Sequence, residues 1–117
     1  MSDPLGDKAY AFALRIVNLS EYLHREKHEY VISRKVLDSG TNIALFIEEG
    51  RQGSDRTDFL QKYSIANKEA FKTNLLLRLL RDSGYVSEPQ AKSLLSDCEE
   101  LQKMLTSAVK KTRSPKD

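Results

Sequence analysis

Residues 37–50, with the sequence LDSGTNIALFIEEG, decide whether this chain contains four helices or five. The Ser-Gly-Thr at 39–41 is typical of a helix end followed by the N-cap of a new helix. Apolar residues from Ile32 to Ile47, however, keep to one helical face straight through Gly40. A break at Gly40 would leave two short halves with no residues for a loop, whereas a bundle needs helices of matching length. The stretch therefore predicts one continuous helix over 30–49, in which small residues allow close packing.

Apolar residues at alternating spacings of three and four predict three further helices, over 7–25, 56–83 and 88–110. Gly84 is typical of the residue that follows the C-terminus of a helix, here the third, and Ser87 with Gln90 forms a capping-box pattern at the start of the fourth. Four helices joined by short links predict an all-α, up-down-up-down antiparallel four-helix bundle. We expect residues 1–117 to form one domain, with a short flexible N-terminus (1–6) and a basic C-terminal tail (111–117).

Composition narrows the class of protein. The 117 residues suffice for one hydrophobic core, and 19 basic against 17 acidic residues leave a net charge of only +2. The single cysteine excludes an internal disulfide, and no apolar run reaches the roughly 20 residues that span a bilayer. We therefore expect a cytoplasmic location and no membrane partner.

Patterns for catalysis or metal binding fail one after another. No Glu directly follows His24, so the metalloprotease pattern fails, and His24 and His28 are expected to be plain surface residues. Glu-x-x-His occurs once, at Glu21–His24, whereas a di-iron bundle needs this motif on two helices. Cys98 lies in an apolar stripe, where it acts as a small hydrophobic residue. We expect no catalytic residue, metal or cofactor. The enzymatic alternative would need Glu48, Glu49, Lys62 and Glu69 to line an open cavity.

Polar residues on the second and third helices predict a layer that fixes their register. In an antiparallel pair, Glu48 or Glu49 should approach Asp58 or Lys62, and Ser39 and Thr41 should approach residues 68–69. The predicted layer consists of Ser39, Thr41, Glu48, Glu49, Asp58, Lys62 and Glu69.

The apolar surface is too extensive for a monomer, because parts of the second and third helices are apolar on two sides. We therefore expect self-association. The candidate contacts are Leu45, Phe46, Leu75, Leu76 and Leu79.

The ordered pattern of both central helices resembles the bacterial four-helix-bundle family of 23S rRNA intervening-sequence proteins. The likeness spans roughly residues 8–110 and includes the order and spacing of all four helices. Its departures are Ala44, Leu45 and Phe46, where the family tends to have Gly-Ala-Asn, and Leu76, where an aromatic residue is usual. The residues that carry the pattern are Ser39, Gly40, Thr41, Ile43, Ile47, Glu48, Glu49, Ser54, Asp58, Phe59, Lys62, Ile65, Ala66, Lys68, Glu69, Ala70 and Thr73.

The resemblance implies a four-helix protomer and a ring-shaped homopentamer. It also implies RNA, DNA or a ribonucleoprotein as a partner, since relatives include the nucleic-acid-binding accessory variability determinant proteins of diversity-generating retroelements. The alternative is a protein-binding subunit with an apolar groove and no nucleic-acid role. The candidate nucleic-acid contacts are Lys68, Lys72, Arg78, Arg81, Lys110, Lys111 and Arg113.

Overall fold

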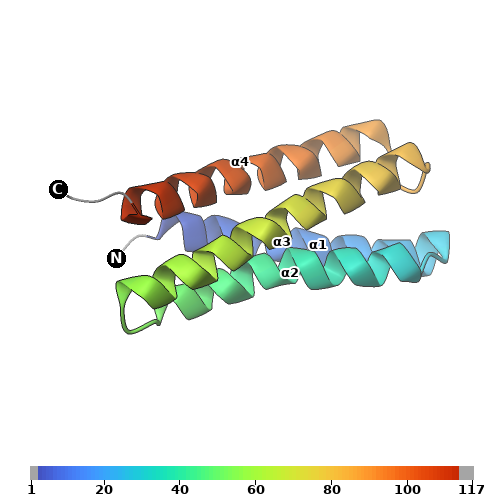
Figure 1. Ribbon diagram of the computed structural model, residues 1–117. Coiled ribbons are helices and arrows are strands. Elements are labelled where there is room, and N and C mark those ends of the chain that lie inside the picture. Colours follow the sequence, from blue (N-terminus) through green and yellow to red (C-terminus); the bar gives the residue numbers. More distant parts are fainter. Residues whose placement is uncertain (1–2, 114–117) are drawn as a thin grey trace.

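The computed structural model describes residues 3–113, and four long α-helices account for nearly all of them. They are α1 (Pro4–Lys27), α2 (Val31–Arg51), α3 (Arg56–Asp82) and α4 (Glu88–Arg113). Each helix runs antiparallel to the one before it, and α4 returns to lie beside α1, as Figure 1 shows. The bundle measures 52 × 25 × 21 Å. The predicted all-α four-helix bundle is confirmed.

The first and last helices, α1 and α4, are longer than the sequence predicted. The side chain of Asp3 accepts a hydrogen bond from the backbone N–H of Gly6, so α1 begins at Pro4 and residues 4–6, expected to be flexible, are helical. At the other end, α4 continues through 111–113, which were expected to belong to the tail. The remainder of both predicted termini, residues 1–2 and 114–117, lies outside the described residues.

Short links with specific caps connect the helices. His28 takes up a left-handed conformation (φ 54°), and the carboxylate of Glu29 then accepts hydrogen bonds from the first backbone N–H groups of α2. Gly84 (φ 82°) follows α3 as predicted, in a conformation that glycine adopts without a Cβ penalty. The predicted capping box is also present: the backbone N–H of Gln90 donates to Ser87 Oγ at 3.3 Å.

Helix α2 runs without interruption through Gly40, because that residue packs against α1. A Cβ on Gly40 would lie 2.8 Å from Ile16 Cγ1 and 2.9 Å from Ile16 Cγ2. Nearby, the hydroxyls of Ser20 and Ser33 form a buried hydrogen bond of 2.9 Å between the same two helices. Small residues therefore bring α1 and α2 close together, as the sequence predicted for Gly40.

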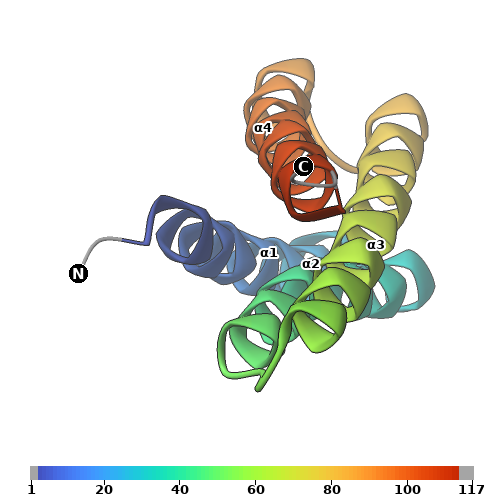
Figure 2. The same ribbon diagram turned by 60° about the vertical axis from the view of Figure 1, so that its left-hand side comes forward.

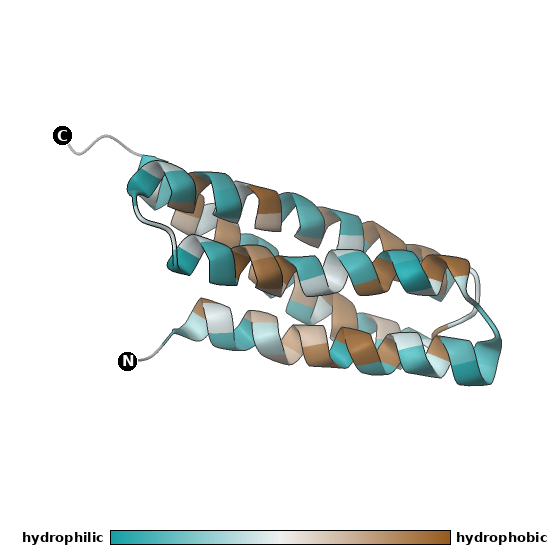
Figure 3. Cartoon of the chain, turned by 90° about the horizontal axis from the view of Figure 1, so that it is seen from below, coloured by the Kyte–Doolittle hydropathy of each residue, from teal (hydrophilic) through white to brown (hydrophobic). Residues whose placement is uncertain are grey.

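The core fills the space between the helices, and hydrophobic and hydrophilic bands alternate along each helix (Figure 3). Phe12, Ile43, Leu77 and Leu101 contribute large, almost fully buried side chains, one from each helix. Ion pairs join α1 to α4: Arg15 lies 2.7 Å from Asp97, and Lys8 lies 3.1 Å from Glu100. The contact between these two helices is the least extensive of the four neighbouring pairs.

Candidate functional site

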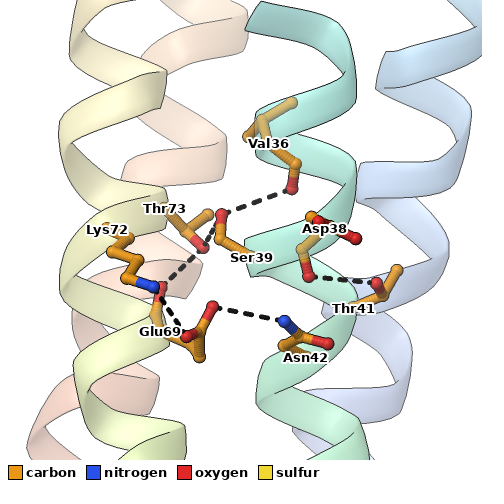
Figure 4. Close-up of polar contacts among 8 residues, drawn as sticks. All are labelled: Val36, Asp38, Ser39, Thr41, Asn42, Glu69, Lys72 and Thr73. Atoms are coloured by element: carbon orange, nitrogen blue, oxygen red, sulfur yellow. Dashed lines mark hydrogen bonds and ion pairs between the residues drawn. The ribbon is translucent and has the colours of Figure 1, made fainter.

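A polar layer lies between α2 and α3, at the level where the sequence predicted one. Thr73 Oγ1 lies 2.8 Å from Ser39 Oγ and 2.8 Å from the backbone carbonyl oxygen of Glu69 (Figure 4). Ser39 and Thr73 are both buried, so this side-chain contact replaces the water that their hydroxyls lose on folding. It joins the midpoints of the two helices and thereby fixes their register.

Glu69 is the one buried carboxylate among the described residues, with 8% of its surface exposed. Lys72 Nζ lies 2.9 Å from Glu69 Oε2, and Asn42 Nδ2 lies 3.4 Å from Glu69 Oε1 (Figure 4). A cavity of about 350 Å³ opens beside these groups and is also lined by Lys35 and Leu75. The carboxylate is thus paired by a cation and an amide, the arrangement that makes burial of a charge tolerable.

Two members of the predicted layer bond within α2 instead of across to α3. Thr41 Oγ1 donates to the carbonyl oxygen of Leu37 at 2.6 Å, which turns it away from the 68–69 region that it was expected to approach. Glu48 pairs with Arg51 at 3.1 Å, one turn along its own helix. This pairing, with a hydrogen bond from Gln52, lowers the pKa of Glu48. Of the two glutamates predicted as alternatives, Glu48 is therefore not the one that contacts α3, because α2 extends past residue 49 and brings Arg51 closer.

The second polar group lies at the link between α2 and α3. Lys62 Nζ is 3.4 Å from Asp58 and 3.7 Å from Glu49, so the predicted approach of Glu49 to Lys62 is confirmed. The residues of the enzymatic alternative do not share one cavity, because Glu69 lines the cavity at mid-helix and Glu48, Glu49 and Lys62 do not.

The most basic feature is a groove between α3 and α4, with a volume of about 800 Å³. Lys68, Lys110 and Arg113 line it, together with the exposed ring of Phe71 and no acidic residue. The amide of Asn67 donates to Thr106 at 3.0 Å, while its buried carbonyl oxygen Oδ1 has no hydrogen-bond partner within the described structure. The groove thus offers three cations and an aromatic face.

The seven candidate nucleic-acid contacts separate into two sets. Lys68, Lys110 and Arg113 line the groove, and Lys111 is exposed near it on α4. The other three bond to their own helix: Lys72 pairs with Glu69, Arg78 donates to Asn74, and Arg81 pairs with Asp82. Of the seven candidates, the four without such a bond therefore lie at or near the α3–α4 groove.

The candidate oligomer contacts also divide. Leu45, Leu75 and Leu79 are exposed, whereas Phe46 and Leu76 are half-buried and pack against the core of their own chain. Three further large apolar residues, Tyr10, Leu14 and Val17, are exposed on α1. These three were not among the predicted contacts, yet they lie roughly 100° to 160° around the helix from buried Ile16, at 3.6 residues per turn, and this offset could have identified them.

Cys98 and the histidines carry no metal-binding geometry. Burial raises the pKa of the Cys98 thiol to about 12, and its Sγ lies 3.3 Å from the carbonyl oxygen of Ala70. His24 packs edge-on against Tyr30, with 5.1 Å between the ring centroids. Within residues 3–113, no three His, Cys, Asp or Glu side chains gather as a metal site would require. No helix in that part of the chain is long and apolar enough to cross a bilayer.

Comparisons with known proteins agree on one family. No curated protein sequence matches this chain. A crystal structure of a protein of unknown function from the S23 ribosomal protein family of Bacteroides thetaiotaomicron superposes with a TM-score of 0.89. The two sequences are 42% identical over 91% of this chain and 98% of that one. The profile of 23S rRNA-intervening sequence proteins matches residues 5–107. The chain therefore belongs to the 23S rRNA-intervening sequence protein family.

Proposed function

We propose that this protein is a non-enzymatic, self-associating four-helix subunit, a homopentamer by its family resemblance, that acts in the cytoplasm as an interaction module. The observation that carries the proposal is the exposed apolar surface: six large side chains, three on α1 and three on α3, have between 43% and 66% of their surface exposed. Aligned apolar groups of this kind mark association surfaces rather than the solvent-facing side of a monomer.

The non-enzymatic part of the proposal rests on how the reactive groups are placed. The candidate carboxylates lie at two separate levels of the α2–α3 pair, and the one buried among them is already paired with Lys72. The Cys98 thiol is buried, which keeps it protonated and away from solvent. These groups are arranged as packing and register contacts.

Light scattering of the purified full-length chain tests the self-association. We expect a single species whose mass is a constant multiple of 13.3 kDa across micromolar concentrations. A monomer throughout that range would refute the proposal. A stable oligomer of another number would retain self-association and refute the pentamer.

A second candidate function is binding of single-stranded nucleic acid in the α3–α4 groove. Lys68, Lys110 and Arg113 could contact phosphates there, and Phe71 could stack on a base. Fluorescence anisotropy with a labelled single-stranded RNA should show an affinity that falls steeply with salt. The double variant Lys68→Glu/Lys110→Glu should reduce that affinity at least tenfold.

Lys92→Glu is the matched control for the groove variants. This exposed lysine lies on α4 about 27 Å from Lys110, from the helical rise of 1.5 Å per residue. The control should leave RNA affinity nearly unchanged. Undetectable binding at low salt, or equal losses in the groove and control variants, would refute the groove. The protein-binding alternative would then be the better description of the same module.

A further inference from the structure

The outer face of α1 is apolar at its centre and acidic at both ends. Tyr10, Leu14 and Val17 follow one another at helical spacing, with 66%, 52% and 44% of their surface exposed. Asp7 precedes them by one turn and Glu21 follows by one turn, and neither has an ion-pair partner within the described structure. We call these five residues the α1 outer face.

Two basic residues of α1 lie elsewhere on the helix, and a third, Arg25, follows Glu21 by one turn and pairs with Glu26 at 3.5 Å. Lys8 and Arg15 point to α4, where Asp97 pairs with both of them. The positive charges of Lys8 and Arg15 are therefore paired within the subunit. The α1 outer face is left with a net charge of −2, from Asp7 and Glu21.

The outer face of α3 has the opposite character. Phe71, Leu75 and Leu79 have 57%, 48% and 43% of their surface exposed and form a continuous apolar stripe. Lys68, Lys72 and Arg78 flank this stripe. We call these six residues the α3 outer face. Lys72 also pairs with Glu69 and Arg78 also donates to Asn74, while Asp82, one turn past Leu79, pairs with Arg81.

The two apolar stripes match in length. Residues 10–17 on α1 span about 10 Å and residues 71–79 on α3 span about 12 Å, at 1.5 Å per residue. Helices α1 and α3 occupy opposite corners of the bundle and do not touch one another (Figure 2). One chain therefore cannot cover its own α1 outer face with its own α3 outer face.

We propose that the α1 outer face of one copy docks on the α3 outer face of the next copy, which specifies the interface of the self-association proposed above. Apolar centres then cover one another, and the carboxylates of Asp7 and Glu21 meet the basic flanks of α3. Pairing of like faces would instead bring acid to acid or base to base. Because each copy uses two different faces, the contact is heterologous and generates a ring when the rotation between copies closes.

This docking reassigns some of the basic residues. Lys72 and Arg78 flank the subunit interface, and Lys68 lies where the interface meets the α3–α4 groove. Phe71 belongs to the α3 outer face, so the docking covers its ring and takes it away from base stacking in the groove. The candidate cations that lie outside both outer faces, and so remain available to a nucleic acid, are Lys110, Lys111 and Arg113, all near the C-terminal end of α4.

Two single variants and their mixture test the docking. Leu14→Glu disables the α1 outer face and Leu75→Glu disables the α3 outer face. Both side chains are exposed in the subunit, so each variant should fold, which circular dichroism can verify. Each variant alone should have a mass of 13.3 kDa by light scattering. An equimolar mixture should form a species of twice that mass, because the two intact faces can join only once.

Val31→Glu is the matched control, since Val31 is also exposed (65%) but lies at the start of α2, outside both faces. It should keep the wild-type mass. If folded Leu14→Glu or Leu75→Glu kept the wild-type mass, or if their mixture stayed monomeric, the docking would be refuted while self-association itself stood. A monomeric wild type would refute both.

Discussion

Replacing Gly40 by alanine tests the close contact between α1 and α2. Helix propensity alone favours the change by about 1 kcal/mol, since alanine loses less backbone entropy than glycine. The added Cβ, however, would come within 2.9 Å of two side-chain carbons of Ile16, which is fully buried. Overpacking of this kind costs about 1–3 kcal/mol. We therefore expect a net loss of about 1 kcal/mol in the free energy of unfolding, measured by urea denaturation.

The sign of the effect should reverse when Ile16 is made smaller. In an Ile16→Ala background the two opposing carbons, Cγ1 and Cγ2, are absent, so Gly40→Ala should become stabilising by the propensity term of about 1 kcal/mol. The comparison is a double-mutant cycle, in which Ile16→Ala alone serves as the control for the cavity that it creates. Equal stabilisation by Gly40→Ala in both backgrounds would refute the argument, because it would show that α1 yields freely at this contact.

Three further perturbations follow from the caps and the buried polar groups. Thr73→Val should cost about 1–3 kcal/mol by leaving the Ser39 hydroxyl poorly satisfied, and the double variant with Ser39→Ala should cost less than the sum of the two single changes; additive losses in thermal or urea unfolding would argue against the pairing. Glu29→Ala should cost about 0.5–2 kcal/mol by removing the acceptor for three N–H groups of α2, whereas a change at exposed Glu26 should be nearly neutral. Cys98 should resist a thiol reagent at pH 8 until the protein unfolds, because the folded-state pKa of its thiol is about 12 against 9.0 when unfolded. Rapid labelling of the native protein would contradict the burial. The same difference in pKa means that the contribution of this thiol to stability is constant below pH 9.0 and declines above it.

The architecture could be predicted from the sequence because several independent signals agreed. The apolar spacing, the capping box at Ser87 and the glycine at 84 each pointed to the observed helices. Gly40 was harder, since its neighbours imitate a helix boundary. The apolar spacing correctly predicted a continuous helix, because the space that a Cβ of residue 40 would occupy is filled by Ile16, which belongs to another helix.

The polar site was only partly predictable, for two physical reasons. A charged side chain pairs with the nearest opposite charge. For Glu48 this is Arg51, one turn along α2, in a part of the helix that lies beyond the apolar pattern. The direction of a residue around a helix also depends on where its neighbours lie. The separation of Lys68 from Lys72 therefore became clear only once α4 was placed beside α3.

The ion pairs between α1 and α4 have a consequence for how fast the chain folds. Every other helix contact joins elements that follow one another in sequence, so most of the structure can form by successive local hairpins. Such topologies fold quickly, on the microsecond-to-millisecond scale. The one closure between distant parts of the chain includes the ion pairs of Lys8 and Arg15 with Asp97, which are partly exposed and so weakened by salt. This closure should therefore be the last step of folding and the first to open.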